Sequence, residues 1–169
     1  MSRWAPWLLV LLIMAACLPQ QEQPLPFETI SHAEVINYRE DNPKLLVITN
    51  TEELKLITFL SVADNTRESE LLDKLRQLDY DHIFVILIFY GYVGSGGYDI
   101  TVQQISRQGD QIFVRATFVS PKSNSLVTLG FTSPYHVVMV PRTGDWNATV
   151  RFVLLKENKL VAETTHFIP

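Results

Sequence analysis

The chain contains little cysteine and no excess of positive charge. One cysteine among 169 residues cannot form an internal disulfide or supply a structural zinc site of three or four thiolates. Fourteen Lys and Arg residues against eighteen Asp and Glu residues give a formal charge of −4, so the chain lacks the basic surface that attracts nucleic acid. Repeats and long polar tracts are also missing, and 47% apolar residues are typical of a globular domain. The composition therefore argues against nucleic-acid binding and against a disulfide scaffold.

Residues 1–16 have the composition of a signal peptide. Arg3 precedes ten uninterrupted apolar residues at 7–16. This run is too short for a membrane span of about 20 residues, but it fits the apolar region of a signal peptide, which has about 7 to 15. Its end, Met14-Ala-Ala-Cys17, resembles the bacterial lipobox, although leucine is commoner than methionine at the first position. The resemblance implies a lipid on Cys17 that attaches the mature chain to a membrane, on the extracytoplasmic side of a bacterial cell envelope. The alternative is an ordinary secretory cleavage site followed by an unmodified cysteine.

Residues 17–26 are predicted to form a flexible tether behind this lipid anchor. Residues 18–26 include three prolines and four Gln or Glu residues, and they contain too little apolar surface to offset the entropy lost on ordering. The folded domain is then expected over 27–169.

The rest of the chain predicts many strands and two helices. Asn50 with Glu53, and Asn65 with Glu68, are possible capping pairs for helices over about 52–62 and over the segment that contains Leu71, Leu72, Leu75 and Leu78. Strands are predicted at 44–49, 83–90, 98–102, 112–118, 135–140, 146–155 and 160–167, with Pro134 at the start of the fifth. The run 83–90 is entirely apolar, which is typical of a central buried strand. The pattern predicts a single α+β domain with a mostly antiparallel, twisted sheet and two helices.

A cluster of glycines follows the apolar strand. Gly91, Gly94, Gly96 and Gly97 resemble a phosphate-binding loop in composition, but no Lys-Ser or Lys-Thr follows them and the next element is a strand instead of a helix. We therefore interpret them as a structural turn in which at least one glycine needs a positive φ. A small-ligand site at this turn is the alternative.

Catalytic and metal-binding patterns are weak. Ser95 has Val93 where a nucleophile elbow has its first glycine, and the four histidines are widely spaced. Asp79 and Asp81 fit a turn at a helix end. We therefore expect no enzyme, metal or cofactor. A small hydrolase that uses His136 with nearby carboxylates is the alternative.

Several motifs between residues 80 and 142 carry a family resemblance. They are the segment Tyr80–Gly91, then Gly96-Gly97-Tyr98 before a strand, then Ser120-Pro121, and finally Ser133-Pro-Tyr-His136. In this order and spacing they resemble the PrcB C-terminal domain family, named for a lipoprotein subunit of a secreted bacterial protease complex. The chain departs from the commoner family pattern at Val93 and Ser95, and in the added strands after Trp146, which either cover a sheet edge or contact a partner.

The resemblance implies a non-catalytic accessory domain that binds an extracytoplasmic protein, with a protease subunit as the partner suggested by the family name. Aromatic side chains concentrate at the centres of protein interfaces. Tyr92, Tyr98 and Tyr135 lie in or beside the family motifs, and they are the candidate partner-binding residues. Packing in the core is the alternative for each of them.

Overall fold

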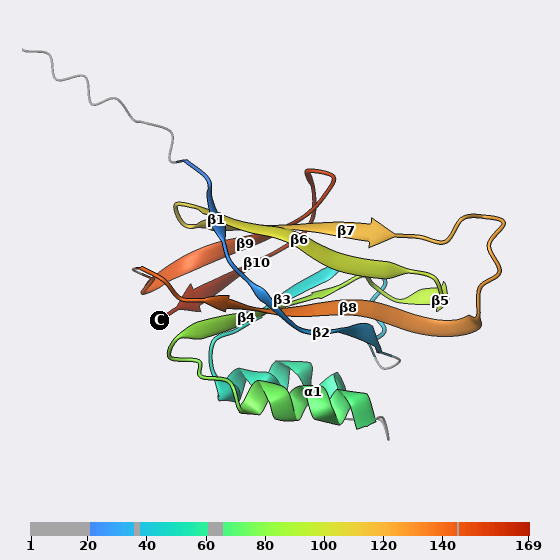
Figure 1. Ribbon diagram of the computed structural model, residues 1–169, viewed down its shortest axis with the longest axis horizontal. Helices are drawn as coiled ribbons and strands as arrows, with labels where there is room; N and C mark the ends of the chain where they lie inside the picture. The colour runs from blue at the N-terminus through green and yellow to red at the C-terminus, as the bar shows by residue number, and fades with distance from the viewer. Residues whose placement is uncertain (1–20, 36–37, 61–65, 145) are drawn as a thin grey trace, which may run out of the picture.

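The computed structural model describes residues 21–35, 38–60, 66–144 and 146–169. Its strands, in which buried and exposed residues alternate, form two sheets. Sheet A has the order β1-β6-β7-β9-β10, from Gln23–Leu25, Asp99–Gln108, Gln111–Val119, Ala148–Lys156 and Lys159–Ile168. Sheet B has the order β2-β8-β4-β3, from Glu28–Val35, Leu129–Pro141, Ile83–Phe89 and Lys44–Ile48, and the short β5 (Val93–Ser95) pairs with β8. The two sheets stack, and the helices cover the outer face of sheet B (Figure 1). The predicted α+β class and single domain are confirmed, with the strands in two sheets.

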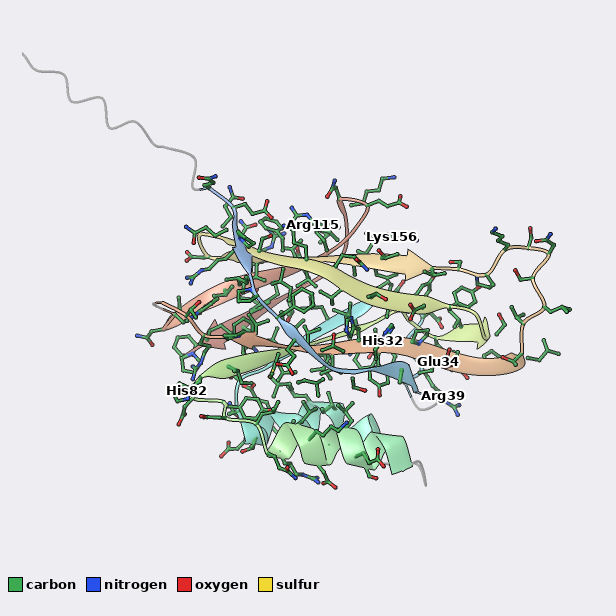
Figure 2. All side chains as sticks on the ribbon, viewed as in Figure 1. His32, Glu34, Arg39, His82, Arg115 and Lys156 are labelled. Atoms are coloured by element: carbon green, nitrogen blue, oxygen red, sulfur yellow. The ribbon has the colours of Figure 1, made fainter. Side chains whose placement is uncertain are left out.

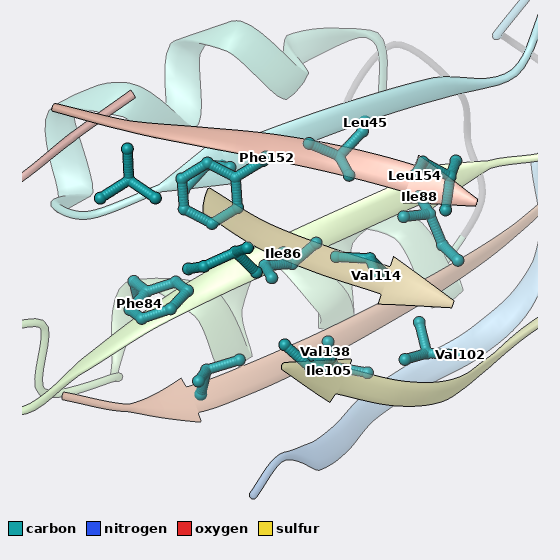
Figure 3. Packing of buried hydrophobic residues seen from close by; sticks show 14 of the residues in the cluster. Leu45, Phe84, Ile86, Ile88, Val102, Ile105, Val114, Val138, Phe152 and Leu154 are labelled. Carbon is teal, nitrogen blue, oxygen red and sulfur yellow. The ribbon is translucent and has the colours of Figure 1, made fainter. Parts of the chain in front are cut away.

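The main core lies between the two sheets (Figure 3). Phe84 of β4 contacts Phe152 of β9 in an edge-on arrangement, with ring centroids 5.9 Å apart. Aliphatic side chains from both sheets fill the remaining space, among them Ile86, Ile88, Val138, Ile105, Val114 and Leu154. Burial of this apolar surface is the principal stabilising contribution to the fold.

A second core lies between sheet B and two helical segments, η1 (Thr51–Leu60) and α1 (Thr66–Arg76). Val85, Leu87 and Phe89 of β4 point into it, while the intervening residues of β4 point into the main core. Burial on both faces explains why this strand is a continuous apolar run. None of the helices in the described ranges is long and apolar enough to cross a membrane.

The first predicted helix differs in type from the expectation. The amide of Glu53 donates to Asn50 Oδ1 at 3.1 Å, so the predicted cap forms. The segment is nevertheless a 3-10 helix with a kink at Ile57, where φ is −115° and ψ is 25°. Ile57 is followed by Thr58, and a pair of β-branched residues weakens a regular α-helix. The second predicted cap residue, Asn65, lies outside the described residues.

The predicted tether is wrong over its second half. Residues 23–25 form β1 and pair with β6, with Pro24 opposite Ser106. Proline is accepted there because β1 is an edge strand and has no partner on its other side. Glu22 also forms an ion pair with Arg115 of β7, with 2.5 Å between Oε1 and Nη1. The folded domain therefore begins at Glu22, before the predicted start at Phe27.

Pro134 is inside a strand and not at its start. Strand β8 runs from Leu129 to Pro141, longer than the predicted strand. The carbonyl of Pro134 accepts a hydrogen bond from the amide of Tyr90, one residue beyond the end of β4. The missing N–H of the proline thus falls where the ladder between β4 and β8 ends, so it disrupts no pair within that ladder.

The strands after Trp146 extend sheet A. Strand β9 pairs with β7 in parallel, and β10 pairs with β9 in antiparallel register. Phe152 and Leu154 of β9 are also fully buried in the main core. These strands were expected either to cover a sheet edge or to contact a partner. The structure supports the first role, because β9 covers the edge of β7.

Candidate protein-binding surface

The glycines after β4 connect this strand to β5 and β6. Gly91 and Gly97 have φ values of +108° and +86°, which side chains disfavour. Gly96 donates its amide to the carbonyl of Thr128 at 3.0 Å, and a Cβ on Gly96 would lie 2.3 Å from Thr128 Oγ1. A Cβ on Gly97 would meet Pro121 and Val127 at 3.2 and 3.3 Å. Gly96 and Gly97 are thus packed against the connection between β7 and β8.

Exposed apolar side chains lie at the end of that connection and at the start of β8. Leu126 and Leu129 are essentially fully exposed, at 105% and 94%, and Phe131 is 61% exposed. With Val127 and Tyr92 they form what we call the apolar tip, at the end of the molecule where β5 and the β7–β8 connection lie (Figure 1). Lys122 is the only charged residue between 120 and 131. Apolar surface of this kind on a folded domain marks a contact site.

The aromatic part of the tip packs against β5. The ring of Phe131 lies 3.5 Å from the position that a Cβ on Gly94 would take. Phe131 also stacks on Tyr92, with ring centroids 5.0 Å apart and an interplanar angle of 9°. The stack holds Phe131 flat against β5 while more than half of its surface stays exposed. The two stacked rings therefore form an apolar platform whose side chains have little conformational entropy left to lose on contact.

The three candidate tyrosines lie in different surroundings. Tyr92 is half-buried and belongs to the tip. Tyr98 is half-buried at the base of the tip, edge-on to Tyr90 at 5.2 Å. Tyr135 is only 2% exposed, because β8 directs it into the helix-side core beside Phe89. The partner-binding prediction for Tyr135 is therefore wrong, whereas those for Tyr92 and Tyr98 stay predictions.

His136 links the two sheets and lacks the geometry of a catalytic base. The amide of Val102 on β6 donates to Nδ1 of His136 at 2.9 Å. Burial lowers the pKa of His136 to about 4, so the ring is neutral at pH 7 and its proton must be on Nε2. Nε2 then donates to Oγ1 of Thr29, 2.8 Å away. In this arrangement His136 cannot take a proton from Thr29, as a triad histidine would take one from its nucleophile.

Three histidines each contact one carboxylate, in three separate pairs. Nε2 of His32 lies 2.6 Å from Oδ1 of Asp99, and the His32 ring is 4.8 Å from that of His136. His82 Nδ1 contacts Asp79 Oδ2 at 2.8 Å, and the same Asp79 accepts the amide of Asp81, so this acidic pair belongs to a turn. His166 Nε2 lies 3.2 Å from Glu53 Oε1. Among the residues that the structure describes, no three His, Cys, Asp or Glu side chains are grouped to hold a metal.

Sequence reasoning missed most of the apolar tip. It singled out Tyr92 for its place beside the glycines, but not Leu126, Leu129 or Phe131. A signal was present, since Leu126-Val-Thr-Leu-Gly-Phe131 is apolar and yet lies outside every strand predicted there. The lipidation site predicted at Cys17 lies outside the described residues and stays a prediction.

Fold and surface together define an α+β domain of two stacked sheets with an exposed apolar tip. Residues 84–141, about a third of the chain, match the model of a family described as PrcB C-terminal. The match confirms the resemblance found in the sequence, and it supports a PrcB-like accessory domain. It spans β4 to β8 and so contains the whole tip, while both helices and the two C-terminal strands lie outside it. No curated protein and no solved structure was found to match the chain.

Proposed function

We propose that this protein is a non-catalytic accessory lipoprotein of a bacterial cell envelope, and that it binds an extracytoplasmic protein through the apolar tip. The observation that carries the proposal is the exposure of Leu126, Leu129 and Phe131 within the segment that matches the family. The family name suggests a protease complex as the setting.

The energetics favour a covered tip. Full burial of a leucine or phenylalanine side chain stabilises by about 1.5 to 3 kcal/mol. Covering Leu126, Leu129 and Phe131 therefore contributes about 4 to 9 kcal/mol before the entropic costs of association are subtracted. A contribution of this size is enough for the centre of a protein interface, where a few residues dominate the affinity.

A lipid on Cys17 would hold the domain close to the membrane. Near the start of the described residues, Glu22 is held to the domain through Arg115 and Ser106. Five Cα–Cα steps separate Cys17 from Glu22, and they reach at most about 17 Å. The tip lies at the other end of β6, because Gln23 pairs with Arg107 near the end of β6 and the glycine segment precedes its start. Ten residues of strand separate the two ends by about 30 Å. In this geometry the tip is free to face a soluble partner.

The test is co-purification from native membranes of the source bacterium. Tagged full-length protein is solubilised in mild detergent, and the bound proteins are identified by mass spectrometry. Leu126→Ser combined with Leu129→Ser should remove the specific partner at unchanged thermal stability, because both side chains are already exposed. Leu160→Ser is the matched control, since Leu160 is 54% exposed on β10 and lies outside the tip.

Three outcomes would contradict the proposal. The first is a partner that binds the double variant as well as it binds the wild type. The second is a mature chain whose Cys17 carries no lipid in intact-mass analysis. This result would contradict the lipid anchor and leave binding through the tip to be tested separately. The third is hydrolysis of ester or peptide substrates by the purified protein, lost in His136→Asn, which would favour the enzyme.

A further inference from the structure

A β-bulge in β6 places two neighbouring glutamines on the same face of sheet A. The pairing of β6 with β7 shifts between Val102 and Gln104. As a result Gln103 and Gln104 are both exposed, between the buried Val102 and Ile105, where an unbroken strand would turn one of them inward. Bulges of this kind redirect side chains and occur preferentially near functional sites.

Each glutamine lines one of two hollows on the outside of sheet A. Gln103 lines a hollow of about 320 Å³, and Gln104 lines one of about 410 Å³. Arg115 and Asn158 line both, so the two hollows adjoin and form what we call the outer groove. Figure 2 shows Arg115 and Lys156 on this side of the molecule, away from the helices. Hollows of these sizes suit small ligands, whose sites measure about 300 to 1,000 Å³.

One wall of the outer groove is the tight turn between β9 and β10. The turn between β9 and β10 has positive φ at Glu157 (48°) and Asn158 (62°). Asparagine tolerates this conformation, but glutamate does so less readily than glycine. Both residues line the groove. Two-residue β-hairpin turns require positive φ at both central residues, so this wall of the groove is shaped by the hairpin itself.

The chemistry of the groove is polar, with balanced charge. Amides of Gln103, Gln104 and Asn158 each offer donors and an acceptor. The cations Arg115 and Lys156 are matched by the carboxylates of Glu22 and Glu157. Arg115 is fixed by two contacts to Glu22, at 2.5 and 3.2 Å, and by one to Ser106 at 2.9 Å. Phe118 also lines the groove, but its half-buried ring packs against the main core and Tyr90, and the Lys156 ammonium lies 5.4 Å from its centroid.

We propose that the outer groove binds a neutral oligosaccharide. Sugar hydroxyls both donate and accept, and planar amide and guanidinium groups can bind adjacent hydroxyls in pairs. Balanced charge gives the groove no preference for an anion or a cation. The two adjoining hollows suit an extended ligand of two or three rings. This site is separate from the apolar tip, and the inference does not depend on the proposed function.

Calorimetry of the full-length protein in detergent tests the site, with chitotriose, cellotriose and maltotriose as probes. At least one should bind, with an affinity that is equal in 50 mM and 500 mM NaCl, because no net charge is neutralised. Gln104→Ala and Asn158→Gly should each weaken binding about tenfold or more. Asn158→Gly keeps the turn, since glycine adopts a positive φ freely. Gln111→Ala on β7, outside the groove, is the matched control and should bind as the wild type does.

Three results would overturn the inference. One is the absence of binding to all three oligosaccharides at millimolar concentration. Another is binding that both groove variants retain in full. The third is salt-sensitive binding of sulfated or phosphorylated sugars in place of the neutral ones, which would make the groove an anion site.

Discussion

Gly91 combines a positive φ with close contact to another backbone segment. Its φ is +108°, and a Cβ built on it would lie 2.6 Å from the backbone oxygen of Asp41. A side chain in this conformation costs about 1 to 3 kcal/mol, and overpacking against a backbone that cannot rotate away costs about 1 to 3 more. We expect Gly91→Ala to lower the free energy of unfolding by about 2 to 6 kcal/mol, a large share of the stability of an ordinary domain.

Two other glycines separate the two contributions. Gly144 has a φ of +84° with nothing within 4 Å of its Cβ position, so Gly144→Ala should show the conformational cost alone. Gly130 has open space and no positive φ, so Gly130→Ala should be nearly neutral. Urea unfolding followed by circular dichroism gives all three values. If Gly91→Ala is no less stable than Gly144→Ala, the close approach to Asp41 is wrong.

Three further predictions concern His136, the tyrosines and β1. Because burial lowers the pKa of His136 to about 4, the unfolded chain binds more protons between about pH 6.5 and 4. The contribution of His136 to stability is therefore full above pH 6.5 and is lost as the pH falls toward 4. Between pH 6.5 and 4, the urea midpoint of His136→Asn should fall less than that of the wild type. Parallel pH profiles of the two proteins would contradict this. Tyr135→Ala should lower the free energy of unfolding by about 3 to 5 kcal/mol, since the Tyr135 ring is buried, and Tyr92→Ala should lower it by less than half as much. Equal losses would contradict the difference in burial between the two rings. Glu22→Ala should speed amide hydrogen exchange at Leu25 by releasing β1 from Arg115, and unchanged exchange would show that strand pairing alone holds β1.

Much of the fold follows from local sequence pattern. The all-apolar run 83–90 is a central strand because β4 is buried on both faces. The alternation over 98–102 and 112–118 predicts two strands, and the structure contains both, as the antiparallel pair β6 and β7. The division into two sheets depends on long-range pairing, and no local pattern encodes the choice of β7 as the parallel partner of β9. Strand β1 escaped prediction because its composition is that of a linker and only pairing with β6 orders it.

The candidate surfaces were less predictable than the fold. Gly96 and Gly97 point to a turn, but their sequence does not reveal that Thr128, Pro121 and Val127 pack on them. Neighbouring glutamines at 103 and 104 look like any polar pair until the bulge places both on one face. Exposure of Leu126 is a property of the folded chain, because an apolar residue in sequence is more often buried than not.

Site-specific photo-crosslinking in living cells of the source organism tests the proposed binding role of the apolar tip most directly. A photoreactive phenylalanine analogue replaces Leu129 in the tip or, as a control, Leu160 on β10, both of which are exposed. We predict a discrete crosslinked adduct with one extracytoplasmic protein from position 129 and none from position 160. Equal crosslinking at the two positions, or none at position 129, would contradict the account.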